Sequence, residues 1–425
     1  MSEKKIHVFT SAALNYLPKA RALFRSIRTH HPEFVLHLAL SDDPRGLVDI
    51  GKEPFDNILP ISELDIPSWL GWAFCHNIVE LSTAIKPFVM KALLQRSDCA
   101  KVIYLDPDMV VFSRLDDIVA ALDEVNIVLT PHQVVPERTL EAVMDNEICS
   151  LKHGVYNLGF VGVAASDEGA RFADWWSNRV YHFCRADIPH GLFTDQRWID
   201  LVPAFFDGVG IIRSSRHNVA PWNITTRTLT GSAREGYAVD GAPLGFYHFT
   251  GFDSGAHKIM AAKNGARNES LSSLIDWYSA ETKSSRSDPL SAVPWAYGQF
   301  FSGRKISAAQ RLVYRERPDL QEAFTNPFDD SNEKSYLSWW NQQGQIEYPL
   351  MQNPITEEEG MKPLRALLSP GFNRGYQAVN LAAVARKFAV GIASPSHGVN
   401  LVARAARIAG REGVSGLIRK LRTIK

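Results

Sequence analysis

Two aspartates, Asp106 and Asp108, stand on either side of Pro107, directly after the apolar residues 102–105. Such an apolar run is typical of a buried strand. Because proline has no backbone N–H, it ends the strand ladder and turns both carboxylates out at the strand's carboxyl end. In an open α/β sheet this edge is where ligands bind. One oxygen from each carboxylate suits a hard divalent cation, Mg²⁺ or Mn²⁺, and leaves coordination positions for water and substrate phosphates.

Two other interpretations fit the same motif. Aspartate and proline are common turn residues, so one alternative is a plain polar turn after the strand. The other is a phosphoryl-transfer enzyme that uses Asp106 as its nucleophile. Such a nucleophile is expected after the first strand of the chain, whereas the first predicted strand lies near the N-terminus, well before Asp106. The position along the chain therefore favours the cation site.

Hydrophobic periodicity predicts the elements that position this motif. A strand at residues 6–10, a helix at 11–30 and a strand at 35–40 form a β-α-β opening, which is typical of a parallel, nucleotide-binding sheet. The chain lacks the Gly-x-Gly-x-x-Gly and Walker lysine loops, so a dinucleotide or P-loop site is not expected. The expected fold class is α/β, a Rossmann-like mixed sheet flanked by helices. Further helices are predicted at residues 79–94, 116–124 and 169–181, and further strands at 127–130 and 156–164.

Several other polar residues could take part in chemistry, and each has an ordinary structural alternative. Asn157 and Gly159 interrupt an apolar strand, which indicates either a bulge or the close approach of a ligand or another backbone. Asp195 stands at a predicted helix start, where capping is its ordinary role. Lys86 lies in a predicted helix, where a solvated lysine is ordinary. His248 lies in an aromatic strand, either as a core residue or as a third ligand for Mn²⁺.

In order along the chain, these segments resemble those of the GT-A glycosyltransferases, in particular the retaining family 8 group and its bacterial relatives. The resemblance runs over roughly residues 6–258 and rests on several motifs in register. The matching segments are residues 9–16 for the first nucleotide-binding loop, 104–108 for the acid motif, 156–160 for the Asn-x-Gly strand, Asp195 with Gln196 for the Asp-Gln helix start, and His248 with Gly251 for the His-x-x-Gly motif.

The resemblance implies a role for each matching residue. Asp106, Asp108 and His248 would hold Mn²⁺ or Mg²⁺ against the diphosphate of a nucleotide sugar, where the cation offsets charge on the leaving group. Asp195 or Gln196 would act in catalysis by stabilising an oxocarbenium-like species while the sugar is transferred with retention. Contacts to the donor would come from Thr10, Ser11, Asn15, Tyr16, Lys86, Asn157, Gly159, Gly251 and Lys258.

The sequence departs from the family pattern at several places, two of which bear on donor binding. Residues 12–14 are apolar, whereas the family's first loop usually carries acids there. Ser254 stands where the family has a lysine that contacts the diphosphate. The candidates to replace that lysine are His257 and Lys258.

The sequence therefore predicts a metal-dependent hexosyltransferase. It would move a sugar from a nucleotide-diphosphate sugar to a carbohydrate or lipid-linked glycan acceptor, in bacterial cell-surface polysaccharide synthesis. Two alternatives remain on the same fold. An inverting transferase would use a carboxylate near the acceptor as general base. A non-catalytic protein would bind the sugar nucleotide or a glycan without transferring the sugar.

Length and composition set the remaining expectations. A chain of 425 residues with 45% hydrophobic and 22% charged residues is typical of a globular protein of two or three folded units. The net charge is zero, which gives no reason to expect nucleic acid as a partner. With neither a signal-peptide pattern nor a membrane-spanning stretch, a cytoplasmic protein is expected. The cysteines, Cys75, Cys99, Cys149 and Cys184, lack Cys-x-x-Cys spacing, which favours reduced thiols.

The C-terminal end of the chain is strongly basic. From residue 361 onward, 12 lysines and arginines stand against the single acid Glu412, and apolar residues recur on one helical face. Such a segment suits the surface of an anionic membrane, on the cytoplasmic face of the inner membrane, although a solvated basic tail has the same composition. We expect three parts, a GT-A catalytic domain at residues 1–265, a helical extension at 266–345 and this basic amphipathic segment at 346–425.

Overall fold

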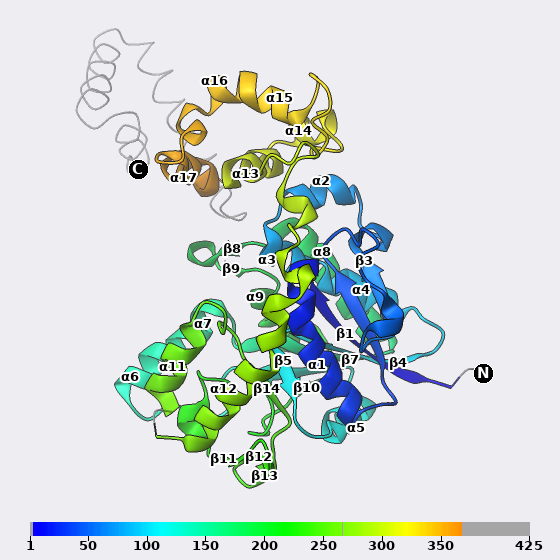
Figure 1. Cartoon of the computed structure of the whole chain (residues 1–425), viewed down its shortest axis with the longest axis vertical. Coiled ribbons are helices and arrows are strands. Elements are labelled where there is room, and N and C mark those ends of the chain that lie inside the picture. The colour runs from blue at the N-terminus through cyan, green and yellow to red at the C-terminus, as the bar shows by residue number, and fades with distance from the viewer. Residues whose placement is uncertain (1–2, 266, 368–425) are drawn as a thin grey trace, which may run out of the picture. The chain divides into compact units, whose positions relative to one another are not determined.

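The structure is a computed structural model that describes residues 3–265 and 267–367 (Figure 1). The chain forms two compact units, residues 1–343 and a second unit that begins at Gly344. The predicted basic amphipathic segment lies largely outside the described residues. The three-part division proposed from the sequence therefore stays a prediction.

The core of the first unit is a mixed β-sheet. Within the described residues, seven strands follow the order β10-β6-β7-β4-β1-β2-β3. All neighbouring strands are parallel except β7, which runs antiparallel to both β4 and β6. The predicted α/β fold class with a mixed sheet is thus confirmed. The strands are β1 (Lys5–Ala12), β2 (Val35–Leu40), β3 (Asn57–Pro60), β4 (Cys99–Leu105), β6 (Ile127–Pro131), β7 (Tyr156–Ala164) and β10 (Val209–Ile211).

Helices cover both faces of this sheet, and two predicted helix boundaries were wrong. Helix α1 (Leu17–His30) begins later than expected, because residues 14–16 form a 3₁₀ turn and Pro18 takes a first-turn position, where its missing N–H costs nothing. The helix predicted at residues 79–94 is two helices, since Pro87 begins a second one. These are α3 (Ile78–Ala84) and α4 (Lys86–Leu94); α5 (Asp116–Glu124) and α8 (Asp167–Phe183) lie close to prediction.

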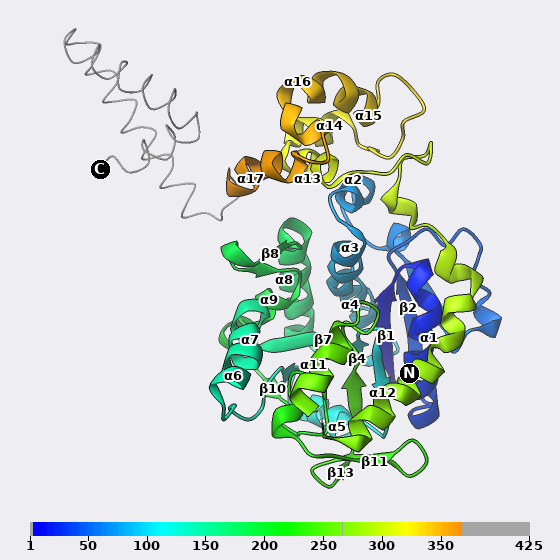
Figure 2. The ribbon, with the colours of Figure 1, turned by 60° about the vertical axis from the view of Figure 1, so that its left-hand side comes forward.

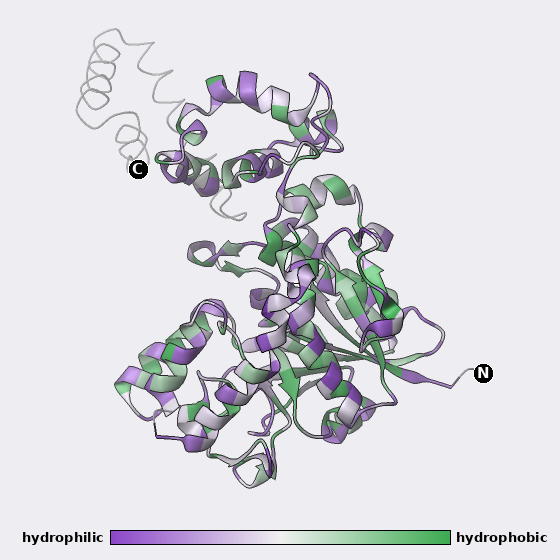
Figure 3. Cartoon of the chain, viewed as in Figure 1, coloured by the Kyte–Doolittle hydropathy of each residue, from purple (hydrophilic) through white to green (hydrophobic). Residues whose placement is uncertain are grey.

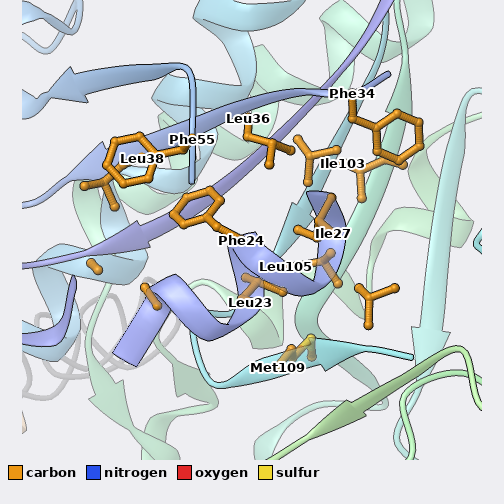
Figure 4. Close-up of a cluster of buried hydrophobic side chains, with 14 of the residues drawn as sticks. Leu23, Phe24, Ile27, Phe34, Leu36, Leu38, Phe55, Ile103, Leu105 and Met109 are labelled. Atoms are coloured by element: carbon orange, nitrogen blue, oxygen red, sulfur yellow. The ribbon is translucent and has the colours of Figure 1, made fainter. Parts of the chain in front are cut away.

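Helix α1 packs its apolar face on the sheet (Figure 4). Leu23, Phe24 and Ile27 are spaced three and four residues apart, so they share one face of the helix and are all buried. The ring of Phe24 lies 4.8 Å from that of Phe55. The central strands are predominantly hydrophobic in Figure 3, as expected for a sheet buried on both faces. Partners of α1 in this cluster include Leu36, Leu38, Ile103, Leu105 and Met109.

A short antiparallel pair extends the carboxyl end of β4. Strand β5 (Met109–Val111) follows the Asp106–Asp108 turn and pairs with β14 (Phe246–His248), which places His248 opposite Met109. Around this pair packs a second apolar cluster, in which the rings of Phe249 and Tyr278 stack at 3.7 Å. Its other elements are β11 (Leu229–Ser232), β12 (Gly236–Val239), α11 (Ala256–Gly265) and α12 (Glu269–Glu281), and β13 (Ala242–Pro243) pairs with β12.

The remainder of the described chain is mainly helical, as predicted. Helices α13 (Ala308–Glu316), α14 (Pro318–Ala323) and α15 (Tyr336–Trp339) belong to the first unit, and α13 lies beside α2 (Figures 1 and 2). The second unit contains α16 (Gln345–Glu347) and α17 (Glu357–Leu367). Shorter elements of the first unit are α2 (Trp69–Phe74), α6 (Leu140–Ala142), α7 (Ile148–His153), β8 (Ala186–Asp187), β9 (Leu192–Phe193), α9 (Gln196–Ile199) and α10 (Val202–Phe205).

The cysteines are free thiols, three of them buried and Cys149 partly buried, which agrees with the prediction. Among the residues that the structure describes, no helix combines the length and apolarity that a bilayer-spanning segment requires.

Candidate active site

The two aspartates of the opening motif and His248 form a cluster at the carboxyl end of β4. The chain turns there because the Asp106 N–H donates to the Gly159 carbonyl (2.7 Å) and the Met109 N–H donates to the Asp106 carbonyl (3.0 Å). Asp106, Asp108 and His248 each offer one ligand atom, and these atoms lie within 4.8 Å of one another. The structure thus assembles the predicted metal triad from two distant segments.

The charges in this cluster depend on each other. Burial raises the pKa of Asp108, but the charge and hydrogen bond of His248 outweigh the effect of burial and leave this pKa below its ordinary value. Nε2 of His248 lies 3.1 Å from Oδ1 of Asp108. Burial lowers the pKa of His248, and the Asp108 and Asp106 carboxylates more than reverse this effect. Either the imidazolium form of His248 or a bound divalent cation can therefore balance the negative charge of these carboxylates.

This donor set fits Mn²⁺ or Mg²⁺. Carboxylate oxygens are the ligands that both cations prefer, and one imidazole is more compatible with Mn²⁺. Nε2 of His248 faces both carboxylates, at 3.7 Å from Oδ2 of Asp106 and 3.1 Å from Oδ1 of Asp108. Nδ1 of the same ring is buried without a hydrogen-bond partner among the described residues. Nε2 is accordingly the nitrogen placed to coordinate.

Lys86 is buried beside Asp106, so the expectation of a solvated helix lysine was wrong. Its ammonium lies 3.2 Å from Oδ1 of Asp106 and donates to the carbonyl of Leu158 (3.3 Å). It also lies 4.3 Å from the centre of the Tyr104 ring, in the range of a cation–π interaction. Burial lowers the pKa of Lys86, and the charges of Asp106 and Asp195 raise it to above its ordinary value.

The hydroxyl of Tyr104 donates to Oδ1 of Asp106. Burial and then the Asp106 charge raise the pKa of Tyr104 well above its ordinary value, so the phenol stays protonated. Sequence reasoning missed this residue. The signal was present, because residues two apart in a strand share a face and Tyr104 precedes Asp106 by two. Tyr104 and Lys86 therefore both hold Oδ1 of Asp106, which leaves Oδ2 facing His248.

Asp195 is also part of this charged cluster, and the alternative that it serves only as a helix cap was wrong. It precedes α9, but it has helical backbone angles and its side chain makes no capping hydrogen bond. Instead its Oδ2 lies 3.2 Å from Nζ of Lys86, and its Oδ1 accepts from the Thr194 hydroxyl (3.1 Å). Burial raises the pKa of Asp195, Lys86 lowers it, and Asp106 adds to the rise, leaving it above its ordinary value.

Strand β7 approaches the triad closely at Gly159. A Cβ atom there would lie 2.4 Å from Cε of Met109, 2.6 Å from Oδ1 of Asn157 and 2.8 Å from Cε1 of His248. The glycine therefore permits close packing next to the third metal ligand. This outcome matches the expectation of close approach. The pairing of β7 with β6 also shifts register in this stretch, between the pairs Leu129–Val161 and Pro131–Tyr156, so an irregularity of the strand accompanies the close approach.

Asn157 is buried and fully engaged with the protein. Its Oδ1 accepts from the Gly159 N–H (2.9 Å), and its Nδ2 lies 3.0 Å from Nε2 of His132. Burial lowers the pKa of His132 to about 4, so this ring is neutral near pH 7 and can accept from the amide. Trp222 places its ring 5.4 Å from both His132 and His248. His132 and Trp222 were not predicted as site residues.

Gln196 is held by the backbone at both ends of its amide. Oε1 accepts from the N–H of Leu158 (3.0 Å), and Nε2 donates to the carbonyl of His153 (3.0 Å). Leu158 thus binds Gln196 through its N–H and Lys86 through its carbonyl. The arrangement fixes Gln196 beside β7, and its catalytic role stays a prediction.

The predicted residues of the first loop differ in accessibility. Thr10 and Ser11 lie within β1 and are buried, and the Ser11 hydroxyl donates to the carbonyl of Ser82 (2.5 Å). Asn15 and Tyr16 are partly buried in the turn that follows β1. Burial and then the charge of Asp108 raise the pKa of Tyr16 well above its ordinary value. The structure brings Tyr16 near the triad, whereas the Thr10 and Ser11 side chains contact protein.

Lys19 lies beside the turn that contains Ser254, the position at which the family has a lysine. Gly251 has φ of +69°, which favours glycine, and it begins a turn that leads into α11. In α11, Lys258 is exposed and His257 is buried against the Tyr247 hydroxyl (3.2 Å). Lys19 of α1 forms an ion pair with Asp253 in this turn. Its ammonium lies 5.4 Å from the Tyr16 ring centre and 5.5 Å from the Phe252 ring centre. Sequence reasoning missed Lys19, because its helix is distant in the chain.

The fold and site define a mixed α/β protein with a candidate divalent-cation site at the carboxyl edge of its sheet. No protein-family model matches the sequence. Over 254 residues the chain is 26% identical to YfnF, an uncharacterised protein of Bacillus subtilis (strain 168), and the match covers 57% of this chain and 82% of YfnF.

Solved structures of glycosyltransferases are similar to this chain at low sequence identity. One is the galactosyltransferase LgtC in complex with donor and acceptor sugar analogues, with a TM-score of 0.38 and 17% identity over 68% of this chain and 97% of LgtC. Another is the glycosyltransferase GlyE of Streptococcus pneumoniae TIGR4, with a TM-score of 0.39 and 14% identity over 66% of this chain and 64% of GlyE. At this level of similarity, function has to be inferred from the site itself.

Proposed function

We propose that this protein is a metal-dependent glycosyltransferase that takes a sugar from a nucleotide-diphosphate sugar. The observation that carries the proposal is the cluster of Asp106, Asp108 and His248 at the sheet edge, with ligand atoms within 4.8 Å of one another. A bound Mn²⁺ or Mg²⁺ would offset the charge that develops on the leaving diphosphate. The sequence motifs, several of which converge on this cluster, support the same assignment.

The buried residues around the triad would orient the reacting groups. Lys86, with its ammonium 3.2 Å from both Asp106 and Asp195, would hold the two carboxylates in fixed positions. Tyr104 would keep Asp106 turned toward the cation through its hydroxyl hydrogen bond. Tyr16 and Lys19 would line the donor side, where Lys19 is placed to take over from the lysine that Ser254 replaces. The remaining predicted contacts, Thr10, Ser11, Asn15, Asn157, Gly159, Gly251 and Lys258, keep their proposed roles in donor binding.

Asp195 is the better placed of the two predicted catalytic residues. Its carboxylate lies beside Lys86, and an anion there would stabilise an oxocarbenium-like sugar. Both ends of the Gln196 amide are already bonded to the backbone, so Gln196 would support β7 and offer the remaining lone pair of Oε1 and the second N–H of Nε2. Retention of configuration is part of the proposal, and an inverting reaction is the alternative outcome of product analysis.

The acceptor and the setting are extensions of the same proposal. A carbohydrate or lipid-linked glycan in bacterial surface polysaccharide synthesis would be the acceptor. The basic composition from residue 361 onward favours a cytoplasmic protein that binds the anionic inner membrane peripherally. Flotation of the full chain with anionic and with neutral liposomes tests this location, and equal flotation with both would oppose it.

A thermal-shift screen of nucleoside diphosphates and their sugars, with and without Mn²⁺, tests the donor assignment. We expect a Mn²⁺-dependent rise in melting temperature for one nucleotide series. Asp108→Asn should remove that rise and reduce transfer by more than about a hundred-fold while the chain stays folded, since a carboxylate ligand is lost. Asp117→Asn, in an ion pair with Arg216 away from the triad, is the control.

Three results, from the screen or from assays of activity, would oppose the proposal. Undiminished turnover by Asp108→Asn would remove its basis. Donor binding with neither hydrolysis nor transfer would favour a non-catalytic binding protein. An acid-labile phosphate on Asp106 would favour phosphoryl transfer.

A further inference from the structure

A cavity of about 500 Å³ lies in the first unit, away from the metal triad. Its walls come from α2, from the end of α8 and the residues that follow it, and from α13 with α14 and the loop after them. Helices α2 and α13, distant in the sequence, lie side by side here (Figures 1 and 2). None of the residues predicted from the sequence as site residues lines it.

One wall of the cavity is aromatic and rigid. The ring planes of Trp72 and Tyr181 are nearly parallel, at 5° with centres 6.0 Å apart, and Nε1 of Trp72 donates to the Tyr181 carbonyl (2.9 Å). The His76 ring meets Trp72 edge-on at 4.7 Å. Burial lowers the pKa of His76 to about 3, so this ring is neutral. Fixed ring faces of this kind pack well against the C–H faces of a pyranose, because they lose little freedom on binding.

Two arginines provide positive charge in the same cavity. Arg315 donates to the carbonyl of Cys75, and its Nη2 lies 3.3 Å from Glu80. Nε of Arg185 lies 3.7 Å from Oδ2 of Asp187. Both arginines line the cavity, and burial and then the charge of Arg315 lower the pKa of Arg185. Partly buried guanidinium pairs of this kind favour phosphate or carboxylate ligands.

Two short stretches of the chain link residues that line the cavity to residues of the active site. The carbonyl of Arg185 accepts from the N–H of Thr194, the residue before Asp195, across the β8–β9 hairpin. On the other side, Glu80 of helix α3 pairs with Arg315. Helix α3 leads directly to Lys86, the first residue of α4. A ligand in the cavity therefore sits next to elements that carry two residues of the active site.

We propose that this cavity is a subsite for an anionic sugar unit of the acceptor, a hexose that bears a phosphate or a carboxylate. The aromatic wall takes the face of the ring and Arg185 with Arg315 takes the anion. Because it concerns the acceptor, this assignment rests on the transferase function proposed above. The cavity holds a unit of the acceptor beyond the one that receives the new sugar.

Isothermal titration calorimetry on the full chain, without donor and without metal, tests the subsite. The probes are glucose 6-phosphate, glucuronic acid, glucose and inorganic phosphate. We expect at least one anionic sugar to bind about ten-fold or more tightly than glucose and than phosphate, as a charge-assisted contact predicts. The stronger of the two anionic probes identifies the source of the charge.

Two variants locate the binding. Thr325→Trp fills the cavity mouth from an exposed lining residue, and it should abolish binding of the anionic sugar. Arg185→Gln should weaken that binding to the level of glucose. Thr228→Trp adds the same ring at an exposed residue of the first unit outside the cavity and should leave binding unchanged.

The results separate this inference from the transferase assignment. If none of the sugars binds, or if Thr325→Trp binds as the unmodified chain does, the subsite assignment is overturned, whatever the donor screen shows. Binding that Thr325→Trp abolishes supports the subsite even where the Mn²⁺-dependent donor effect fails.

Discussion

The ammonium of Lys86 lies 3.2 Å from the carboxylate of Asp195, although the two residues belong to different helical segments far apart in the sequence. The same ammonium lies 3.2 Å from Asp106. Lys86 and Asp195 are almost completely buried, so neither charge is well solvated. One lysine thus balances two carboxylates, and removing it leaves two like charges in a site of low dielectric.

Lys86→Met should therefore destabilise the protein by about 3 kcal/mol, because an uncompensated buried charge remains. Urea denaturation measures this free energy of unfolding. In the double variant Lys86→Met with Asp195→Asn, most of the lost stability should return, since one of the two carboxylates is gone. Lys91→Met on the same helix, whose side chain is more exposed, is the control and should cost less than about 1 kcal/mol. A double variant no more stable than Lys86→Met would contradict the shared-cation interpretation.

Gly159→Ala should weaken Mn²⁺ binding about ten-fold or more with the fold retained. The new methyl group would enter space held by Met109 and by Cε1 of His248, 2.8 Å away, so the imidazole has to move. Gly162→Ala in the same strand is the matched control, since its Cβ meets only Leu122, at 3.0 Å or more. Calorimetric titration with Mn²⁺ measures both. Equal Mn²⁺ affinities for the two variants would show that β7 does not position His248.

Lys19→Gln should raise the Kd for the nucleoside diphosphate selected by the donor screen about ten-fold, because a charge-assisted contact is removed. Lys19 is buried, and it is held by Asp253 and by the rings of Tyr16 and Phe252. Arg25→Gln, on the same helix with its guanidinium paired to Glu281, should leave this Kd unchanged. If both variants bind the nucleotide as the unmodified chain does, Lys19 serves only to anchor the turn at Asp253.

Much of the fold follows from local patterns in the sequence. Strand β2 and helix α5 begin and end where periodicity placed them, since both have a clear apolar pattern and polar ends. Helix α1 was predicted too long, because a 3₁₀ turn and Pro18 at its start are local details that an apolar pattern does not report. The clustering of Asp106, Asp108 and His248 was predictable, because the two aspartates are two residues apart in the sequence and His248 belongs to a recognisable motif.

The contacts around the triad were not predictable in the same way. Lys86 and Asp195 each have an ordinary local role, as a solvated lysine and a helix cap, and only tertiary packing buries them together. The sequence also gives no sign of a function for Tyr104, Lys19 and His132. Each lies in or next to an element that its apolar pattern explains as part of the fold. The cavity between α2 and α13 depends on the packing of segments far apart in the chain, for which the sequence provides no local signal.

The paired histidines of β1 and β2 predict how stability depends on pH. Nδ1 of His7 lies 2.9 Å from Nε2 of His37, both rings are buried, and Asp98 lies 3.4 Å from His7. Burial and then the charge of His7 lower the pKa of His37 to about 3. A lowered histidine pKa means that the unfolded chain binds the proton more tightly. The stability due to neutral His37 is therefore complete above pH 6.5, its ordinary pKa, and is lost as the pH falls toward 3.

His37→Gln should reduce this acid sensitivity. An amide can keep the hydrogen bond to His7, and it does not titrate. Between pH 7 and pH 5, the unmodified chain should lose about 2 kcal/mol more of its free energy of unfolding than the variant, as linkage predicts for a pKa that falls from its ordinary value to about 3. Urea denaturation at both pH values measures the difference. Because every other group titrates in both proteins, equal losses would show that His37 accepts its proton in the folded state.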